Sequence, residues 1–239
     1  MTEKNPELED MKSFYDDVYY ADANKPLQGS AHLQKLARIV AVSRDESVLD
    51  IACGLGEWLH VCLGRGATVA GVDLSERAIE YCEKHMPAGT FHAGPAENLP
   101  FEDAQFDLVS CLGSLEHFVE PVVALRQMVR VAKPGARFLI LVPNADFLTR
   151  KLRLFGGTNQ KDAKEVVRTL TEWESLFNQA GLSVTRKWKD LHVISWRWIS
   201  MNGWLAVLPR LLQALALWVW PLRWQYQVYH LCEQSQTAK

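Results

Sequence analysis

The sequence predicts an α/β fold in which helices cover both faces of a doubly wound, mostly parallel sheet of seven strands. Between residues 48 and 145, short apolar runs alternate with helical segments, as in parallel strands joined by right-handed crossovers. The run Val48–Ile51 leads into a turn that contains Gly54 and Gly56, and a second apolar run ends at Asp73. A strand, a glycine turn, a helix and a second strand with a terminal acid form the first half of a nucleoside-binding unit.

Two amphipathic helices are predicted ahead of the first strand. Apolar and aromatic residues recur at helical spacing over residues 8–20, and Pro26 and Gly29 end this segment. Residues 32–42 form the second predicted helix. We therefore expect residues 1–45 to form a helical cap beside a cofactor-binding core at 46–145.

The core contains the five strands and three helices of the predicted parallel part. We place the strands at 47–51, 68–72, 89–92, 106–111 and 136–142, and the helices at 56–64, 75–85 and 121–132. In such a sheet, ligands bind where the strands end at their carboxyl edge. Gly54, Asp73, Ala96 and the loop 111–117 should all open at that edge.

The C-terminal half, 146–239, completes the single predicted domain. Residues 146–160 form a loop-rich insertion, and a helical segment follows over 161–181, with Thr169 or Thr171 as its cap and Gly181 at its end. The last two strands are predicted at 182–188 and 225–232. Two stretches, 146–168 and 193–224, have the character of lids.

Most of the chain's nine tryptophans lie in residues 196–224, and residues 211–222 are almost wholly apolar. The run is shorter than the roughly 20 uninterrupted apolar residues that a spanning helix needs. Three arrangements fit it: a buried helical hairpin over the substrate pocket, an interfacial element that contacts a bilayer or a hydrophobic substrate, or a dimer face. We favour the buried hairpin, because flanking lysines are missing.

Composition limits the partners of this 239-residue chain. A hydrophobic fraction of 48% is ample for a core, and a net charge of −2 provides no general attraction to nucleic acid. The five scattered cysteines have no metal-ligand spacing, so we expect no metal site and free thiols in a reducing cytoplasm. The polar, acidic stretch 1–10 does not resemble a signal peptide.

The first turn distinguishes between two nucleoside cofactors. A dinucleotide site normally has a third glycine three residues after the second, and Leu59 stands there. Glu57 opens the following helix, where a carboxylate would repel a pyrophosphate. S-adenosylmethionine has a sulfonium and an ammonium instead, so it tolerates Glu57 and Asp50. A carboxylate at Asp73 can accept hydrogen bonds from both ribose hydroxyls.

Four blocks of the chain resemble a class I S-adenosylmethionine-dependent methyltransferase of the small-molecule type that includes the quinone methylases. Residues 48–56 resemble the first motif and residues 70–75 the ribose-binding motif. Residues 96–101 with 106–110 resemble the adenine loop and fourth strand, and residues 131–136 the turn into the fifth strand. The resemblance implies a Rossmann-like methyltransferase sheet with an antiparallel last strand. It also implies cofactor contacts at Asp50, Ala52, Gly54, Gly56, Asp73, Leu74, Ala96, Glu97 and Leu112.

Two positions depart from the family pattern. Ala52 replaces the first glycine of the turn, and Pro95 replaces the acid that usually precedes Ala96. Proline offers neither a side-chain acceptor nor a backbone donor. We expect adenine recognition to depend on main-chain groups around Ala96, or on Glu97.

Methyl transfer needs a base only when the acceptor is protonated at neutral pH. His117, in the loop after the fourth strand, is our candidate, with Glu116 and His192 as weaker ones; the alternative is that His117 only packs beside the cofactor. The resemblance implies that the N-terminal helices line the substrate entrance, where Tyr15, Tyr19 and Tyr20 could contact a ligand; the alternative, which we prefer for any single tyrosine, is that it only packs against the sheet. We name Tyr19 and His192 as candidate substrate contacts.

The leading function is therefore methyl transfer to an oxygen or nitrogen of a small organic acceptor, such as a sugar, glycolipid, quinone or other metabolite. Two alternatives stay open: a non-catalytic S-adenosylmethionine-binding protein or regulatory subunit, and a nicotinamide oxidoreductase. Nucleic-acid methylation is disfavoured, because the chain has no Asn-Pro-Pro-aromatic tetrad and no basic stripe.

Overall fold

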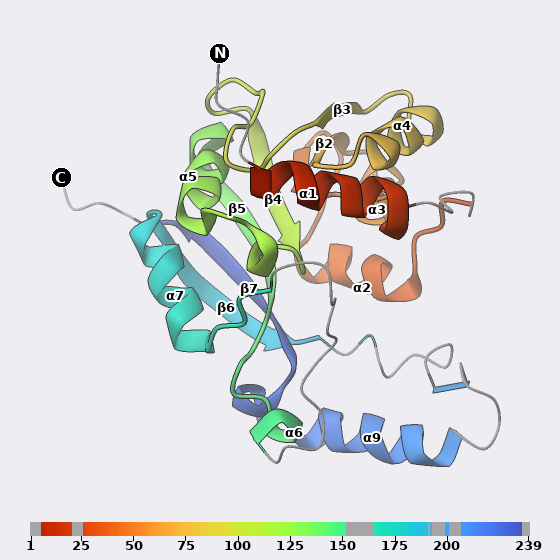
Figure 1. The fold of residues 1–239 in the computed structure, drawn as a ribbon, viewed down its shortest axis with the longest axis vertical. Coiled ribbons are helices and arrows are strands. Elements are labelled where there is room, and N and C mark those ends of the chain that lie inside the picture. Colours follow the sequence, from red (N-terminus) through yellow and green to blue (C-terminus); the bar gives the residue numbers. More distant parts are fainter. Residues whose placement is uncertain are drawn as a thin grey trace.

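The fold is organised around one seven-stranded sheet with helices on both faces (Figure 1). The computed structural model describes residues 6–20, 26–151, 165–190, 192, 199–200 and 207–235. The strand order is β3-β2-β1-β4-β5-β7-β6, and β7 alone runs antiparallel to its neighbours. The doubly wound sheet and its antiparallel last strand are as predicted. The strands are β1 (Ser47–Ile51), β2 (Thr68–Asp73), β3 (Thr90–Ala93), β4 (Phe106–Leu112), β5 (Ala132–Pro143), β6 (Leu182–Lys189) and β7 (Gln227–Gln234).

The two faces of the sheet build two apolar cores. Figure 1 shows α2 (Ala31–Ile39), α3 (Glu57–Leu63) and α4 (Glu76–His85) on one side, and α5 (Pro121–Val131) and α7 (Leu170–Gln179) on the other. Neighbouring residues of β1 serve opposite cores, since Val48 packs with α2 and α3 whereas Leu49 packs with α5 and α7. Both are fully buried, which explains why β1 reads as a continuous apolar run.

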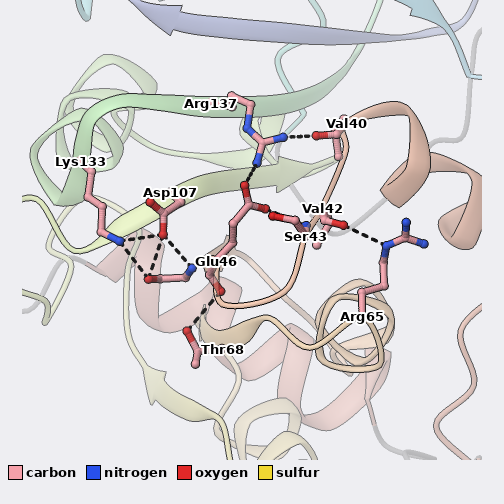
Figure 2. Close-up of polar contacts among 10 residues, drawn as sticks. Val40, Val42, Ser43, Glu46, Arg65, Thr68, Asp107, Lys133 and Arg137 are labelled. Atoms are coloured by element: carbon pink, nitrogen blue, oxygen red, sulfur yellow. Dashed lines mark hydrogen bonds and ion pairs between the residues drawn. The ribbon is translucent and has the colours of Figure 1, made fainter.

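Ion pairs fasten the amino ends of the central strands, on the edge opposite the predicted site (Figure 2). Asp107 accepts hydrogen bonds from the Ser47 backbone at 2.9 Å and from Lys133 Nζ at 2.7 Å, so one carboxylate joins β1, β4 and β5. Arg137 donates to Glu46 at 2.5 Å and to the Val40 carbonyl, which ties the end of α2 to the same edge. This network fixes the frame and leaves the carboxyl edge available for ligands.

The N-terminal segment is two elements rather than the single predicted helix. α1 (Pro6–Phe14) continues into η1 (Tyr15–Tyr19), a π-helical turn in which the Tyr20 amide donates to the Tyr15 carbonyl at 2.9 Å. The segment is attached to the start of α4: the carboxylate of Asp16 accepts from the Ser75 hydroxyl and from the Arg77 amide, at 2.5 and 3.3 Å.

Several boundaries differ from the predicted ones. The helix predicted at 32–42 ends at Ile39, and the strand predicted at 225–232 is shifted to Gln227–Gln234. β5 begins at Ala132 rather than at 136, because Ala132 already pairs with Phe106 of β4. A short helix, α6 (Leu148–Lys151), lies in the stretch predicted as loop; the rest of that insertion, 152–160, and the first four residues of the predicted helix, 161–164, lie outside the described residues. Residues 165–169 are not helical, so the helix predicted from 161 is wrong there.

The start of α7 is set by a capping box. Thr169 Oγ1 accepts from the Glu172 amide at 3.3 Å, and Glu172 Oε2 accepts from the Thr169 amide at 2.7 Å. Of the two threonines predicted as caps, Thr169 is the one that serves. Gly181 follows the helix with φ +84°, a conformation that favours glycine.

We favoured a buried helical hairpin for the tryptophan-rich residues 196–224, and this prediction is wrong for α9. α9 (Val207–Val219) is a single helix, which Figure 1 places at the far end of the molecule from α1 and α4, and Ala214 is the one fully buried residue on it. η5 (Leu222–Trp224) joins it to β7. Within the part of the chain that the structure describes, no helix is long and apolar enough to span a bilayer.

Candidate cofactor and acceptor site

A cavity opens at the carboxyl edge of the sheet, at the end of β1. In the sheet, β1 has β2 on one side and β4 on the other. This is the switch point at which doubly wound sheets bind ligands. The loops after β1, β2, β3 and β4 and the N-terminal segment all contribute to the lining. Its residues include Tyr15, Tyr20, Ala52, Asp73, Leu74, Gly94, Pro95, Ala96, Glu97, Ser114 and His117.

The turn after β1 requires its two glycines for different reasons. Gly54 and Gly56 have φ +53° and +74°. A Cβ on Gly54 would lie 2.8 Å from the Tyr20 hydroxyl, so this position keeps the turn open toward the cavity. A Cβ on Gly56 would collide with Met86 and Cys82 of the α4 region, so Gly56 serves packing against the protein.

Ala52 lines the cavity with φ +56°, in the left-handed region where residues with a Cβ are strained. The family glycine that the sequence lacks would therefore suit this backbone better.

Asp73 ends β2 with its side chain on the cavity and 6% of its surface exposed. Its Oδ2 accepts from the Gly54 amide at 2.8 Å, and its Oδ1 accepts from the Ser75 amide at 2.9 Å. Burial raises its pKa, and these two amides act against that rise. Each oxygen keeps a further lone pair, so the carboxylate can still accept from a diol.

Asp50 lies beneath the turn and does not reach the cavity lining. Its Oδ1 accepts from Ser110 Oγ at 2.6 Å, and Ser110 Oγ accepts from Trp58 Nε1 at 3.0 Å. Burial raises the pKa of Asp50 to about 7, although the Ser110 hydrogen bond opposes the shift. These hydrogen bonds, from Trp58 to Ser110 and from Ser110 to Asp50, thus join α3, β4 and β1 below the cofactor turn.

The loop after β3 forms the predicted adenine side of the cavity. Pro95 and Ala96 line it, and the Gly94 amide donates to the Asp73 carbonyl at 2.9 Å, which holds this loop beside the ribose-binding acid. Glu97 also lines the cavity, while its Oε1 accepts from the Glu120 amide at 3.2 Å. Leu112, at the end of β4, is partly buried against the core and lies outside the lining.

His117 and Glu116 lie together in η2 (Leu115–His117), after β4. His117 lines the cavity with 9% of its surface exposed. Glu116 is 5% exposed, and its Oε2 has no hydrogen-bond partner among the described residues. Burial raises the pKa of Glu116 to about 7. The loop therefore places an imidazole on the cavity beside a buried carboxyl that can hold a proton near neutrality.

The N-terminal tyrosines divide between the cavity and the surface. Tyr15 and Tyr20 line the cavity and stack at 6.2 Å between ring centroids, whereas Tyr19 is 54% exposed and lies outside the lining. The cavity volume is about 70 Å³. Ligand pockets usually begin at roughly 300 Å³, so the cavity is narrower here than a bound nucleoside needs.

His192 lies at a second cavity, of about 650 Å³, between α2 and the end of β6. The side chain of Asp190 is 4% exposed and holds two imidazoles, with His192 Nδ1 at 2.5 Å and His32 Nε2 at 3.3 Å. His32 Nε2 also contacts the buried Tyr229 hydroxyl at 2.9 Å. The hydrogen bond to Asp190 raises the pKa of His192, whereas burial lowers that of His32.

The structure brings together half of the twelve predicted site residues. Six of them share the first cavity: Ala52, Asp73, Leu74, Ala96, Glu97 and His117. The other six lie outside its lining: Asp50, Gly54, Gly56, Leu112, Tyr19 and His192. Sequence reasoning missed Asp16, Asp190 and Tyr229, because Asp16 meets Ser75, and both Asp190 and Tyr229 meet His32, only across the fold.

Comparison with known proteins agrees with this geometry. The family model described as "Methyltransferase domain" matches residues 49–140. An uncharacterized methyltransferase of Synechocystis sp. is 33% identical over 156 residues, covering 62% of this chain and 72% of the relative. A demethylmenaquinone methyltransferase of Paenarthrobacter aurescens is 27% identical over 213 residues, covering 87% and 83%.

Solved structures share the fold. The 1,6-didemethyltoxoflavin-N1-methyltransferase of Burkholderia thailandensis, with 1,6-didemethyltoxoflavin and S-adenosylhomocysteine bound, superimposes with a TM-score of 0.62 at 18% identity, covering 96% of this chain and 87% of that one. Sequence motifs, sheet topology and relatives agree, and the chain belongs to the class I S-adenosylmethionine-dependent methyltransferases.

Proposed function

We propose that this enzyme transfers the methyl group of S-adenosylmethionine to an oxygen or nitrogen of a small organic acceptor. The observation that supports this best is Asp73, a buried carboxylate on the cavity that orders the glycine turn and retains free lone pairs for a ribose. Gly94 and Ala96 would border the adenine, and the turn Ala52–Gly54 the aminoacyl end.

The cofactor supplies a methyl group already activated by the positive sulfonium. The tasks of the chain are then to align the acceptor, to exclude water and to accept a proton where the acceptor has one. We assign the proton-accepting role to His117, since it lies on the cavity after β4. Glu116, buried beside it with one unpaired oxygen among the described residues, is the second candidate.

The class of acceptor is proposed from the relatives. These include an O-methyltransferase of Penicillium expansum and several demethylmenaquinone methyltransferases, so a hydroxyl of an aromatic or quinone-derived acceptor is the first class to test. All five cysteines are buried and free, which supports a reducing, cytoplasmic setting.

A methyl-transfer assay with labelled S-adenosylmethionine tests the function. Phenols, hydroquinones, amines and sugars would be offered to the purified full chain, with cofactor binding measured separately by calorimetry. Transfer to one class, lost in His117→Ala while cofactor affinity is kept, is the expected result. Tight cofactor binding without transfer to any class would favour the non-catalytic binder.

A further inference from the structure

One face of α9 is an apolar stripe that the described chain leaves uncovered. Residues 208, 211, 212, 215, 218 and 219 recur at the spacing of one helix face. Their exposed fractions run from 42% to 67%, which is high for leucine, valine and tryptophan on the surface of a protein. The stripe residues are Leu208, Leu211, Leu212, Leu215, Trp218 and Val219.

The C-terminal end of this helix is held against the sheet by polar side chains. Lys189 Nζ donates to the Trp218 carbonyl at 2.7 Å, and Gln225 Nε2 donates to the Leu217 carbonyl at 2.7 Å. Gln225 is itself 1% exposed, and its own carbonyl accepts from Asn144 at 3.1 Å. The stripe is therefore presented outward by a fixed attachment at the ends of β5 and β6.

The sequence on either side of the stripe carries charge of one sign. From residue 191 to residue 232 it contains no aspartate or glutamate, whereas arginine occurs at 197, 210 and 223. Arg223 lies over the ring of Trp224 at 5.3 Å, just beyond the helix. A helix with leucines and a tryptophan on one side, in a sequence segment with arginines and no acids, has the pattern of helices that lie in the interface of an anionic membrane.

A second copy of this chain is the less favoured occupant. A dimer face built on α9 would bring together two copies of a segment that contains arginines and no acids, so the like charges of the two copies would oppose the contact. An anionic bilayer supplies both the apolar layer and the negative charge. The tryptophan of the stripe, Trp218, also suits the boundary between water and acyl chains.

We propose that the α9 stripe docks this protein on the surface of anionic phospholipid bilayers. The helix lies in the plane of the membrane, with Leu211 and Leu215 in the acyl layer and Arg223 among the head groups. This inference does not depend on which acceptor is methylated, because it concerns a surface remote from the cofactor turn along the chain.

Flotation of the full chain with vesicles tests the proposal. Vesicles of phosphatidylcholine alone are compared with vesicles that contain 30% phosphatidylglycerol. We expect binding to the anionic vesicles, weakened at least about tenfold in Leu211→Glu or Leu215→Glu. Gln213→Glu adds the same charge to the same helix at an exposed position off the stripe, and should bind as the unmodified protein does.

Three outcomes would overturn the proposal: no binding to anionic vesicles, equal loss in the stripe variants and the Gln213→Glu control, or a lipid-free dimer that Leu211→Glu dissociates, as seen by light scattering. Circular dichroism and calorimetric binding of S-adenosylhomocysteine establish that each variant is folded. A failure of methyl transfer alone leaves the vesicle result unaffected, so the two proposals fail separately.

Discussion

Asp73 has two structural duties before any ligand binds, because its two oxygens hold the Gly54 and Ser75 amides. The ribose would add a third. Replacing this carboxylate therefore removes both a ligand contact and the order of the turn, and the second effect makes the expected loss larger than that of a simple surface contact.

We expect Asp73→Ala to weaken binding of S-adenosylmethionine by a factor of ten or more. Two hydrogen bonds to a charged group are lost, each worth about 1.5–3 kcal/mol. Calorimetric titration measures the change, and Asp103→Ala, on the far edge of the sheet in an exposed ion pair with Arg130, is the control. An unchanged affinity in Asp73→Ala would remove the ribose assignment.

Ala52 provides a second test on a single residue. The left-handed conformation costs a residue with a Cβ about 1–2 kcal/mol, and glycine loses about 0.5–1 kcal/mol through its freer unfolded chain. Ala52→Gly should thus raise the free energy of unfolding by up to about 1 kcal/mol in denaturant titrations. Ala104, with φ +56° in an exposed turn, gives a matched variant: Ala104→Gly should stabilise similarly. Destabilisation by both would contradict the strain argument.

At the scale of the element, α7 shows what a sequence pattern can decide. Apolar periodicity located this helix and left two threonines as caps. The structure uses Thr169, whose hydroxyl meets the Glu172 amide. Thr169→Ala should lower the free energy of unfolding by about 1 kcal/mol, the usual value of an N-cap. Thr171→Ala, exposed within the first turn, should change it by less than half as much in the same measurement.

The N-terminal segment is the element whose attachment we expect to control cofactor retention. Asp16 joins it to the start of α4 through the Ser75 hydroxyl and the Arg77 amide. Asp16→Asn should speed dissociation of bound S-adenosylhomocysteine about three- to tenfold, since one or two charge-assisted hydrogen bonds at a partly exposed site weaken. Stopped-flow displacement measures the rate. Asp17→Asn, whose carboxylate lies 3.7 Å from Arg77, should have little effect, and equal rates in both variants would refute the attachment.

The strands could be predicted from the sequence because buried parallel strands read as apolar runs and end in the residues of the site. The predicted cofactor residues came mainly from the family resemblance, and five of the nine, Ala52, Asp73, Leu74, Ala96 and Glu97, line the cavity. The exposure of α9 could not be predicted, since an all-apolar stretch looks alike whether protein or solvent surrounds it. Nor could the π-helical turn at Tyr15, because aromatic spacing over five residues does not distinguish it from an α-helix.

Over the whole molecule, buried acids set the pH dependence of stability. Burial raises the pKa of both Asp50 and Glu116 to about 7, so the folded state keeps protons that the unfolded state has lost above pH about 4. Stability from these groups is complete below that pH and declines as pH rises through 7. His230 acts oppositely between about 4 and 6.5, because burial lowers its pKa to about 4.

Glu116→Gln should flatten this dependence. The variant lacks the carboxyl that must ionise in a buried place, so its free energy of unfolding should fall less between pH 5 and pH 8, by on the order of 2 kcal/mol. Urea titrations at both pH values measure the difference. A slope identical to that of the unmodified protein would mean that Glu116 is solvated in the folded state.

The widened turn at Tyr15–Tyr19 has a consequence for the spacing of the chain. In an ordinary α-helix, side chains five positions apart point about 140° away from each other. Here the Tyr20 amide donates to the carbonyl of Tyr15, five residues earlier, and this hydrogen bond brings the two rings into a stack over the cofactor turn. Deleting a single residue between Tyr15 and Tyr20 would separate the two rings and leave the cavity uncovered on one side. The length of this short stretch, more than its composition, is therefore the property to preserve when the protein is redesigned.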